Sequence, residues 1–360
     1  MRQFVQDSPD AFAGQVFFVG IDVHKKQWTC SVRANRMNLD KPVVIEASAK
    51  AVSSFLQRRY PGGTFRAVYE AGYSGFWPAR ELSEAAIATL VVNPADVPSK
   101  NKELANKTDR VDSAKLARSL ENGELTGIYQ PSRQAEELRA LNRYRNQLIK
   151  DQTRLKNRLK AMLAQFNYRP PTELEGRQSK ALQAWLEGIR FETPYAQLVF
   201  DERLRQLAES RQRQARLLRQ MRQMASQETE IAQVIGLLQS IPGVGFLTAM
   251  LLVTELIDIR RFKTADDLVA FIGLVPKVHQ SDETSYQRGL SNRRNAELRS
   301  RLIEAAWIAA RKDPALTLKF GQLTQRMHRN KAIIRIAKLL VKRIRHVWKT
   351  KTPYAIGIIA

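Results

Sequence analysis

Four carboxylates occupy positions at which their side chains would meet. Asp22 and Glu70 each follow an apolar run of strand length, and Asp109 and Asp112 lie three residues apart in a segment with a helical pattern. Residues i and i+3 share one face of a helix, so both aspartates would point the same way. Each acid alone is typical of a strand-end cap or a solvated helix face. Only the set of four predicts a site.

Clustered carboxylates need cations, because like charges held together disfavour the ionised forms. Hard oxygen donors select Mg²⁺ or Mn²⁺, and two such ions roughly 3.5–4 Å apart can clamp a phosphodiester. We therefore expect a catalytic metal site for phosphoryl transfer, formed by Asp22, Glu70, Asp109 and Asp112.

The elements around these acids predict a mixed α/β domain over residues 16–125. Expected strands lie near 17–21, 28–32, 43–45, 65–69 and 87–92, and expected helices near 49–59, 78–86 and 108–120. A sheet that begins with a hairpin and continues in this order resembles the ribonuclease-H fold, in which the first and fourth strands are neighbours. The C-terminal ends of those strands and the last helix would then carry the four acids to one place.

The charge balance indicates a polyanionic partner. There are 59 Lys and Arg against 35 Asp and Glu, a formal net charge of +24. Nucleic acid is the expected partner, with an acidic membrane surface as the second choice. No apolar run approaches the roughly 20 residues of a membrane-spanning helix, and residues 1–14 lack the basic start of a signal peptide. With a single cysteine, Cys30, we expect a cytoplasmic, nucleoid-associated protein with no membrane partner.

Residues 133–232 predict a basic antiparallel coiled coil. Apolar residues recur at two seam positions, namely Leu141, Leu148, Leu155 and Met162 at one and Leu138 and Leu159 at the other. A second long helix is expected over about 195–233. The many cations with few acids between them favour a surface that follows phosphates over a merely solvated helix face. Arg154 and Arg158 are candidate nucleic-acid contacts.

Residues 236–360 are expected to form a third, mostly helical part. It opens with Ile241-Pro242-Gly243-Val244-Gly245, a turn between helices that resembles the hairpin of helix-hairpin-helix modules. Gly243 and Gly245 would let the backbone approach a DNA phosphate, which the amides of the next helix can accept. An ordinary helical turn is the alternative. The chain ends with a basic helix over residues 331–349.

A polar loop is expected over residues 277–290, after an apolar helix and the turn Gly273-Leu274-Val275-Pro276. Its hydroxyls belong to Ser281, Thr284, Ser285 and Tyr286. A hydroxyl beside arginines could attack a phosphate, since guanidinium groups match phosphate geometry. The neighbouring candidates for nucleic-acid binding are Arg288, Arg293 and Arg294. Exposed loop serines are common, so the residues alone leave the nucleophile open.

The order of five motifs resembles the DEDD transposases, insertion-sequence recombinases related to the Piv pilin-gene invertase and guided by a bridge RNA. The motifs are Gly20-Ile21-Asp22-Val23-His24-Lys25, Tyr69-Glu70-Ala71-Gly72, Lys107-Thr108-Asp109-Arg110-Val111-Asp112, Ile241-Pro242-Gly243-Val244-Gly245 and Gly273-Leu274-Val275-Pro276. The resemblance runs from about residue 16 to the last helix. It implies a RuvC-like N-terminal domain with the four acids as metal ligands, and a C-terminal transposase domain whose serine becomes covalently joined to DNA.

The resemblance points to Ser281 as that serine. In the family it follows the Gly-Leu-x-Pro turn by a few residues and is often followed by glycine. Ser281 fits the position, but Asp282 follows it and Ser285 is close, so Ser285 stays an alternative. The later glycine, asparagine and Leu-Arg pair of the family match Gly289, Asn295 and Leu298-Arg299.

The resemblance also implies partners that the residue pattern does not show. These are donor DNA, target DNA and a structured noncoding guide RNA that pairs with both. Lys107, beside the acids, is a further candidate nucleic-acid contact. The need to handle four strand ends favours a dimer or tetramer. The alternatives are a hydrolytic RuvC-like nuclease without a covalent intermediate and, third, a nucleic-acid-binding protein that is not an enzyme.

Overall fold

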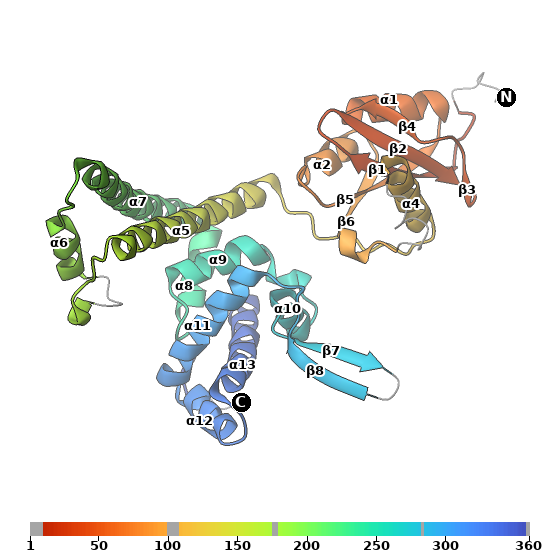
Figure 1. The fold of residues 1–360 in the computed structure, drawn as a ribbon. Coiled ribbons are helices and arrows are strands. Elements are labelled where there is room, and N and C mark those ends of the chain that lie inside the picture. Colours follow the sequence, from red (N-terminus) through yellow and green to blue (C-terminus); the bar gives the residue numbers. More distant parts are fainter. Residues whose placement is uncertain (1–9, 99–107, 175–178, 282–283, 358–360) are drawn as a thin grey trace. The chain divides into compact units, whose positions relative to one another are not determined.

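The computed structural model describes residues 10–98, 108–174, 179–281 and 284–357, and for residues 277–281 and 284–288 it describes the backbone only. The chain divides into two compact units, residues 1–132 and 133–360, and each is described by itself. Figure 1 labels their helices and strands. Within the described ranges, no helix is long and apolar enough to cross a membrane.

The first unit is built on a mixed sheet with the order β3-β2-β1-β5-β6. Its strands are β1 (Val16–Val23), β2 (Gln27–Ala34), β3 (Met37–Asn38), β4 (Val43–Glu46), β5 (Thr64–Glu70) and β6 (Ala88–Val92). β1 and β2 form the expected opening hairpin, and β4 also pairs with β2. The fourth predicted strand, near residues 65–69, corresponds to β5. It is a parallel neighbour of β1, as predicted for the first and fourth strands. Only the two-residue β3 was not predicted.

Helices cover both faces of this sheet. α1 (Ala49–Arg59) and α2 (Trp77–Glu84) pack on one face, where they bury Phe17 and Trp28, and α4 (Asp109–Glu121) packs on the other. Side chains alternate between the faces of a strand, so successive β1 residues serve the two layers in turn. The predicted helix order is confirmed, with α2 one or two residues earlier than expected.

Gly20 lets α4 lie directly on β1. A Cβ atom at this position would come within 2.0 Å of the backbone oxygen of Ser113 and 2.5 Å of the backbone nitrogen of Ala117. Any side chain here would therefore push α4 off the sheet. Because α4 carries Asp109 and Asp112, this close approach fixes where those acids lie.

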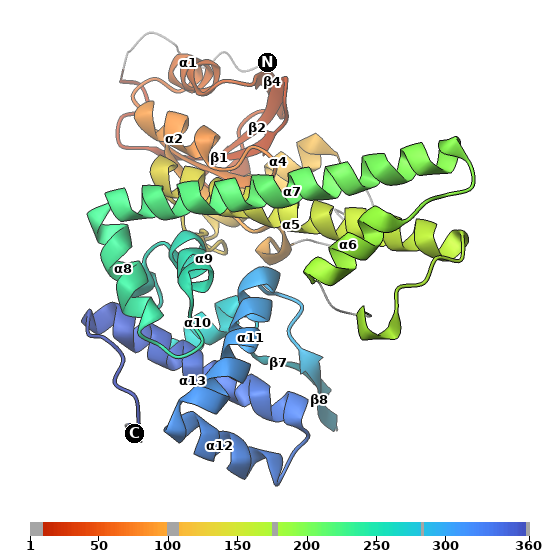
Figure 2. The ribbon, with the colours of Figure 1, turned by 90° about the vertical axis from the view of Figure 1, so that its left-hand side faces the viewer.

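The second unit contains a long helical hairpin, α5 (Arg133–Gln165) and α7 (Pro194–Gln227), which run side by side in Figures 1 and 2. Between them lie η2 (Thr172–Leu174) and α6 (Lys180–Gly188). Gln214 donates a hydrogen bond to the Leu148 oxygen at 3.2 Å and Arg203 to the Arg158 oxygen at 3.0 Å, so the pair is antiparallel, as predicted.

Two details of this hairpin differ from the sequence prediction. The second helix was expected to continue to about residue 233, but α7 ends at Gln227 and α8 (Thr229–Gln239) follows. Glu228, between them, has extended dihedral angles of −97° and 101°, which no continuous helix allows. The helix α6 was not predicted at all.

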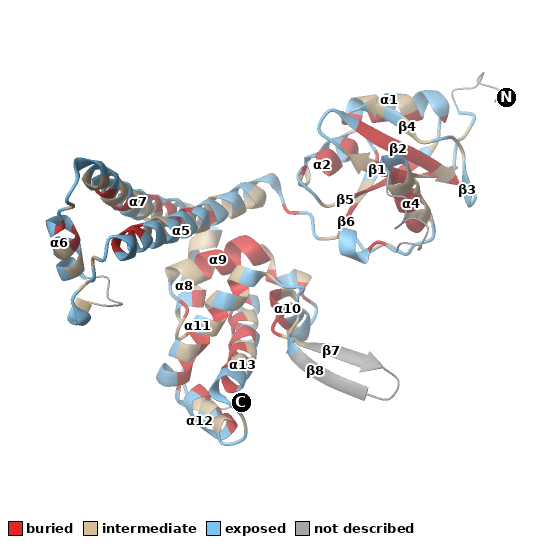
Figure 3. Cartoon of the chain, in the orientation of Figure 1, coloured by how far each residue is buried: buried red, intermediate tan, exposed pale blue. Residues whose placement is uncertain are grey.

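The C-terminal helices share one hydrophobic core. They are α9 (Phe246–Leu256), α10 (Ala265–Ile272), α11 (Ala296–Lys312), α12 (Pro314–Thr324) and α13 (Arg329–Thr350). The basic helix expected at the chain end is amphipathic, and its apolar face is buried at Ile336 and Leu340 (Figure 3). Leu148 of α5 and Leu217 of α7 belong to the same core. The division expected at 232–236, into a coiled coil and a transposase domain, stays a prediction.

The polar loop expected over residues 277–290 is instead an antiparallel hairpin of β7 (Pro276–Ser281) and β8 (Thr284–Leu290). Ser281 pairs with Thr284 and is the last residue of β7. The prediction was wrong because the segment lacks the apolar alternation by which strands are recognised, whereas strand pairing itself needs only backbone hydrogen bonds.

Candidate functional site

The structure brings all four predicted carboxylates to one pocket. Asp22, Glu70, Asp109 and Asp112 line a cavity of about 230 Å³ together with His24. The parallel register of β1 and β5 sets the first two acids side by side at the C-terminal ends of their strands. The first turn of α4 supplies the other two.

Three contacts hold α4 in place. The Thr108 side chain caps its first turn by accepting a hydrogen bond from the Val111 amide at 3.4 Å. Ser113 meets Ser31 of β2 through their hydroxyls at 2.8 Å, and both side chains are buried. At the other end of the helix, the guanidinium of Arg33 pairs with Glu121 at 2.9 Å. The position of the acids therefore depends on contacts along the whole helix.

Two cationic or potentially cationic side chains that contact the acids of this pocket were missed from the sequence. His24 Nε2 lies 3.2 Å from Asp22 and 3.4 Å from Asp109. Lys115 Nζ lies 3.5 Å from both Glu70 and Asp112, and its side chain is only 10% exposed. The spacing Asp112-x-x-Lys115 on a helix and Asp22-x-His24 on a strand are the signals that could have found them.

Burial changes the pKa of Asp22, the more buried of the two acids at the strand ends. Desolvation raises the pKa of the Asp22 carboxyl, His24 opposes that shift, and Asp109 and Asp112 add to it. The pKa of the nearby Tyr73 is also raised, first by desolvation and then by the Asp22 charge. The pocket is thus an anionic one that a cation would stabilise.

The donor set fits a divalent cation. One ligand atom each from Asp22, His24 and Asp109 lies within 4.8 Å of the others, close enough to contact a single ion. Carboxylate oxygens suit Mg²⁺ and Mn²⁺, whereas an imidazole nitrogen is a more common ligand of transition metals than of Mg²⁺. Glu70 and Asp112, on the Lys115 side of the pocket, are the further candidate ligands.

The base of the β7–β8 hairpin is held by residues that match the family pattern. Arg299 donates to the backbone oxygens of Gly273 at 3.2 Å and Ser291 at 3.1 Å, which joins the turn before the hairpin to the segment after it. Asn295 caps α11 by accepting from the Leu298 amide at 3.1 Å. The side chains of Ser281, Ser285 and Arg288 lie outside the described residues, and so does Lys107.

The turn between α8 and α9 is packed closely on one side. Gly243 has φ of +90°, and a Cβ atom there would come within 2.3 Å of the Ala305 oxygen of α11. A glycine is therefore required by packing and by backbone conformation. Gly245, the N-cap of α9, is exposed and has open space around its Cα. A DNA contact at these glycines stays a prediction.

The remaining predicted nucleic-acid contacts are exposed. Arg154 pairs with Asp151 at 2.8 Å on the surface of α5, and Arg158 lies one turn further along the same helix. Arg293 and Arg294 are exposed in the segment between β8 and α11.

Two family models match the chain. A model of the transposase IS116/IS110/IS902 family matches residues 235–322, and a model of DEDD-type IS110 transposases matches residues 19–168. The second match contains all four carboxylates, and the first contains the α8–α9 turn and the β7–β8 hairpin.

Relatives in three bacteria agree with these matches. A putative transposase, y4qE, of Sinorhizobium fredii is 26% identical over 81% of this chain and 71% of its own length. The transposase for IS1111A of Coxiella burnetii is 27% identical over 72% and 70%, respectively. The transposase for IS1533 of Leptospira borgpetersenii is 24% identical over 81% and 84%.

These matches define the class of the protein. It is a DNA transposase, an enzyme that cuts and rejoins DNA. It belongs to the IS110/IS116 family of DEDD transposases, and its N-terminal α/β domain is accordingly RuvC-like.

Proposed function

We propose that this transposase recombines DNA through a phosphoserine intermediate on Ser281. In this proposal Asp22, Glu70, Asp109 and Asp112 hold Mg²⁺ or Mn²⁺. The observation that carries it is the convergence of these four side chains on one pocket in a chain matched by transposase models at both ends.

The chemistry is a pair of transesterifications. Ser281 Oγ forms a bond to phosphorus while the P–O3′ bond breaks, and the hydroxyl proton goes overall to the departing 3′ oxygen. A 3′ hydroxyl of another strand then attacks the phosphoserine, forms the new phosphodiester and returns the proton to serine. The ester conserves the bond, so rejoining needs no external energy source, whereas attack by water would lose it.

Each group of residues has a separate task. When bound, the divalent cation stabilises charge that develops on the phosphate oxygens. Arg288, Arg293 and Arg294 orient the phosphate, since guanidinium groups match its geometry. Ser281 and the four acids belong to different units of the chain, so the complete site forms when both units engage DNA, within one subunit or between subunits of a dimer or tetramer.

The guide for this reaction is a structured noncoding RNA that pairs with donor and target DNA. Support comes from the resemblance of the motifs and from the surface of the helical hairpin. Exposed arginines follow α7, namely Arg205, Arg211, Arg213, Arg216, Arg219 and Arg222. Such a row suits a phosphate backbone without reading its sequence. The RNA that co-purifies with the protein from its native host tests this part.

A denaturing gel with labelled DNA that carries a nick tests the intermediate, because the nick traps a covalent adduct. The wild-type protein and Ser285→Ala should form the adduct, and peptide mapping should find phosphate on Ser281. Ser281→Ala should bind DNA normally and form no adduct. Phosphate on Ser285 or Tyr286 would move the nucleophile, and cleavage without any adduct would favour a hydrolytic RuvC-like nuclease.

A further inference from the structure

The far end of the helical hairpin carries a pocket that the reaction described above does not use. It lies between the last turns of α5, the segment that follows them, α6 and α7, and its volume is about 540 Å³. Leu159, Leu163, Leu186 and Leu207 form a buried apolar floor, and Trp185 lines the wall. This volume is that of a small-molecule site rather than a packing defect.

The rim of the pocket is cationic. Lys156, Lys160, Arg169 and Arg211 line it, and among the described lining residues there is no acid. Burial lowers the pKa of the Lys156 ammonium, and the neighbouring Arg211 and Lys160 charges lower it further. The cations are thus close enough to repel one another, and an anion placed between them would relieve that repulsion.

The combination of an aromatic wall, an apolar floor and a cationic rim has one common occupant. Proteins bind unpaired nucleotides by setting the base against aromatic and apolar side chains while lysine or arginine contacts the phosphate. A base inside a duplex is stacked between its neighbours and can enter a pocket only after it is flipped out of the helix, which costs free energy that an unpaired base does not pay. Arg211 is also one of the exposed arginines along α7, so a phosphate backbone bound along this helix could reach the rim.

We propose that the pocket formed by Trp185, the leucine floor and the rim cations Lys160 and Arg211 binds one unpaired nucleotide of the nucleic acid that this transposase handles. The base would lie against Trp185 and its phosphate between Lys160 and Arg211. This inference rests on the nucleic-acid binding of the proposed function, but it does not require Ser281 or the metal site.

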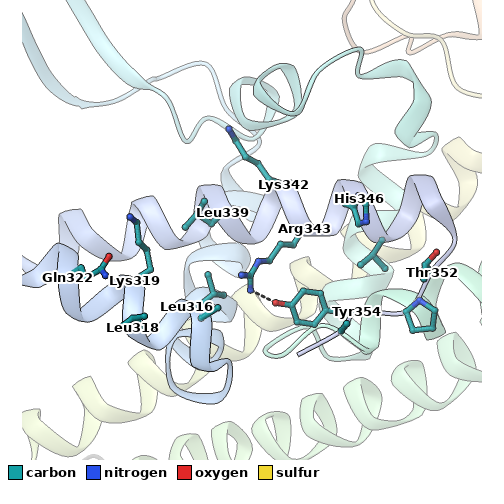
Figure 4. A pocket seen from close by; sticks show the side chains of 14 residues that line it. Leu316, Leu318, Lys319, Gln322, Leu339, Lys342, Arg343, His346, Thr352 and Tyr354 are labelled. Carbon is teal, nitrogen blue, oxygen red and sulfur yellow. Dashed lines mark hydrogen bonds between the residues drawn. The ribbon is translucent and has the colours of Figure 1, made fainter. Parts of the chain in front are cut away.

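A larger cavity in the same unit shows that size alone does not make a cavity a nucleotide-binding site. The space between α12, α13 and the C-terminal segment measures about 850 Å³ (Figure 4). There the Arg343 guanidinium is paired with the fully buried Asp313 at 2.7 Å and hydrogen-bonded to Tyr354. Lys342, also on its lining, pairs with Asp266 at 3.3 Å. These two cations already have anionic partners, and the described lining holds no tryptophan against which a base could stack.

The test uses the full-length protein and a short duplex with one bulged nucleotide. Its controls are the same duplex with an abasic bulge and the duplex with no bulge, each made in DNA and in RNA. We expect the base-containing bulge to bind about tenfold more tightly than the abasic one, the effect of one stacked base. The DNA and RNA series show which nucleic acid supplies the nucleotide.

Substitutions test whether the preference for a base-containing bulge comes from this pocket. Trp185→Leu should reduce the ratio between base and abasic bulges to about one, as expected when a stacking ring is lost, and should leave binding of the plain duplex unchanged. Unchanged duplex binding also shows that the variant is folded. Tyr195→Leu, at an 81% exposed aromatic residue of α7 outside the pocket, should keep the ratio. Lys160→Gln with Arg211→Gln should weaken bulge binding severalfold and flatten its salt dependence.

Two outcomes would overturn the inference. They are equal binding of base and abasic bulges by the wild type and an unchanged ratio in Trp185→Leu. If that unchanged ratio is accompanied by a shift of the protein-only oligomeric state, the pocket is a contact between copies of the chain. If the wild-type protein shows the expected ratio between base and abasic bulges but forms no covalent adduct, this result contradicts the phosphoserine proposal alone.

Discussion

Glu255 accepts a hydrogen bond from Asn295 through Oε2 and Nδ2 at 3.0 Å, and so connects two distant parts of the second unit. The same carboxylate, only 6% exposed, pairs with Arg143 at 3.2 Å and Arg139 at 3.7 Å on the first turns of α5. Asn295 lies between the β7–β8 hairpin and α11, and the first strand of that hairpin ends at Ser281. One buried acid therefore ties the start of the long helical hairpin to the segment that carries the proposed nucleophile.

Glu255→Gln should destabilise the second unit. The substitution keeps the size of the side chain but leaves the largely buried Arg139 without its charged partner, and breaking such a pair costs about 3 kcal/mol. Urea unfolding measures the loss. Glu304→Gln removes an exposed partner of Arg301 and should cost under about 1 kcal/mol. Equal stability of the two variants would show that the Glu255 carboxylate does not stabilise the second unit more than an exposed ion pair does.

The carboxylate variants Asp22→Asn, Glu70→Gln, Asp109→Asn and Asp112→Asn should each abolish DNA cleavage and leave the fold intact. Each removes a charged oxygen from the only described pocket in which all four acids meet. Cleavage of a labelled substrate in Mg²⁺ and in Mn²⁺ is the measurement, with the exposed Glu84→Gln of α2 as the control. Full activity of both Asp109→Asn and Asp112→Asn would place the metal elsewhere.

Gly20→Ala should damage the first unit more than an alanine substitution in open space. The new Cβ would lie 2.0 Å from the Ser113 oxygen, so α4 must move and take Asp109 and Asp112 with it. We expect a loss of 1–3 kcal/mol, about the cost of overpacking a core, together with weaker metal-dependent cleavage. Gly236→Ala in α8, where nothing lies within 4 Å, should be neutral or stabilising. Thermal unfolding of both variants provides the comparison.

Asp40 should contribute stability that is lost in acid. The Arg59 guanidinium hydrogen-bonds to Asp40, and with the Tyr60 hydroxyl it holds the pKa of that carboxyl below its ordinary value of 3.8. Since the folded pKa is the lower one, this stabilisation is present above pH 3.8 and declines as the pH falls from there through the folded value. Asp40→Asn should lower stability slightly near neutral pH and remove this part of the acid dependence. If Asp40→Asn instead lowers the stability by the same amount at every pH, the pKa of Asp40 does not contribute to the acid dependence of stability.

The salt dependence of nucleic-acid binding should depend on the arginine row of α7. Arg213→Gln, Arg216→Gln and Arg219→Gln together should reduce the slope of log affinity against log salt by about one per phosphate contact removed. The matched control changes as many exposed charges in the first unit, at Lys41, Lys50 and Arg58. Equal slopes in both triple variants would remove the hairpin from the interface.

The convergence of the four acids on one pocket was predictable because its parts have strong local patterns. Apolar runs that end in Asp22 and Glu70 mark strand ends, and Asp109 and Asp112 share a helix face, so a hairpin-first sheet order was enough to join them. The partners His24 and Lys115 were not predicted. A single cation two or three residues from an acid is common on any surface, and only the packing of α4 on β1 shows that these two contact acids from another element.

Other elements differ in how far the sequence predicts them, for different physical reasons. The seam leucines fixed the antiparallel hairpin of α5 and α7, since a heptad repeat commits a helix to a partner. The strands β7 and β8 have polar sequences, and their pairing depends on backbone bonds that composition does not reveal. The break at Glu228 is a matter of tertiary packing, which overrides the helical propensity of the surrounding residues.

The ammonium group that lies between Glu70 and Asp112 has a consequence for how the domain folds. A cluster of acids without any counter-charge would resist folding until an ion arrived, as happens in small domains that are unfolded without their metal. Lys115 offsets part of that repulsion from within the chain. We therefore expect the RuvC-like domain to fold without an ion between its acids, so that a newly made chain would not need metal to reach its native structure.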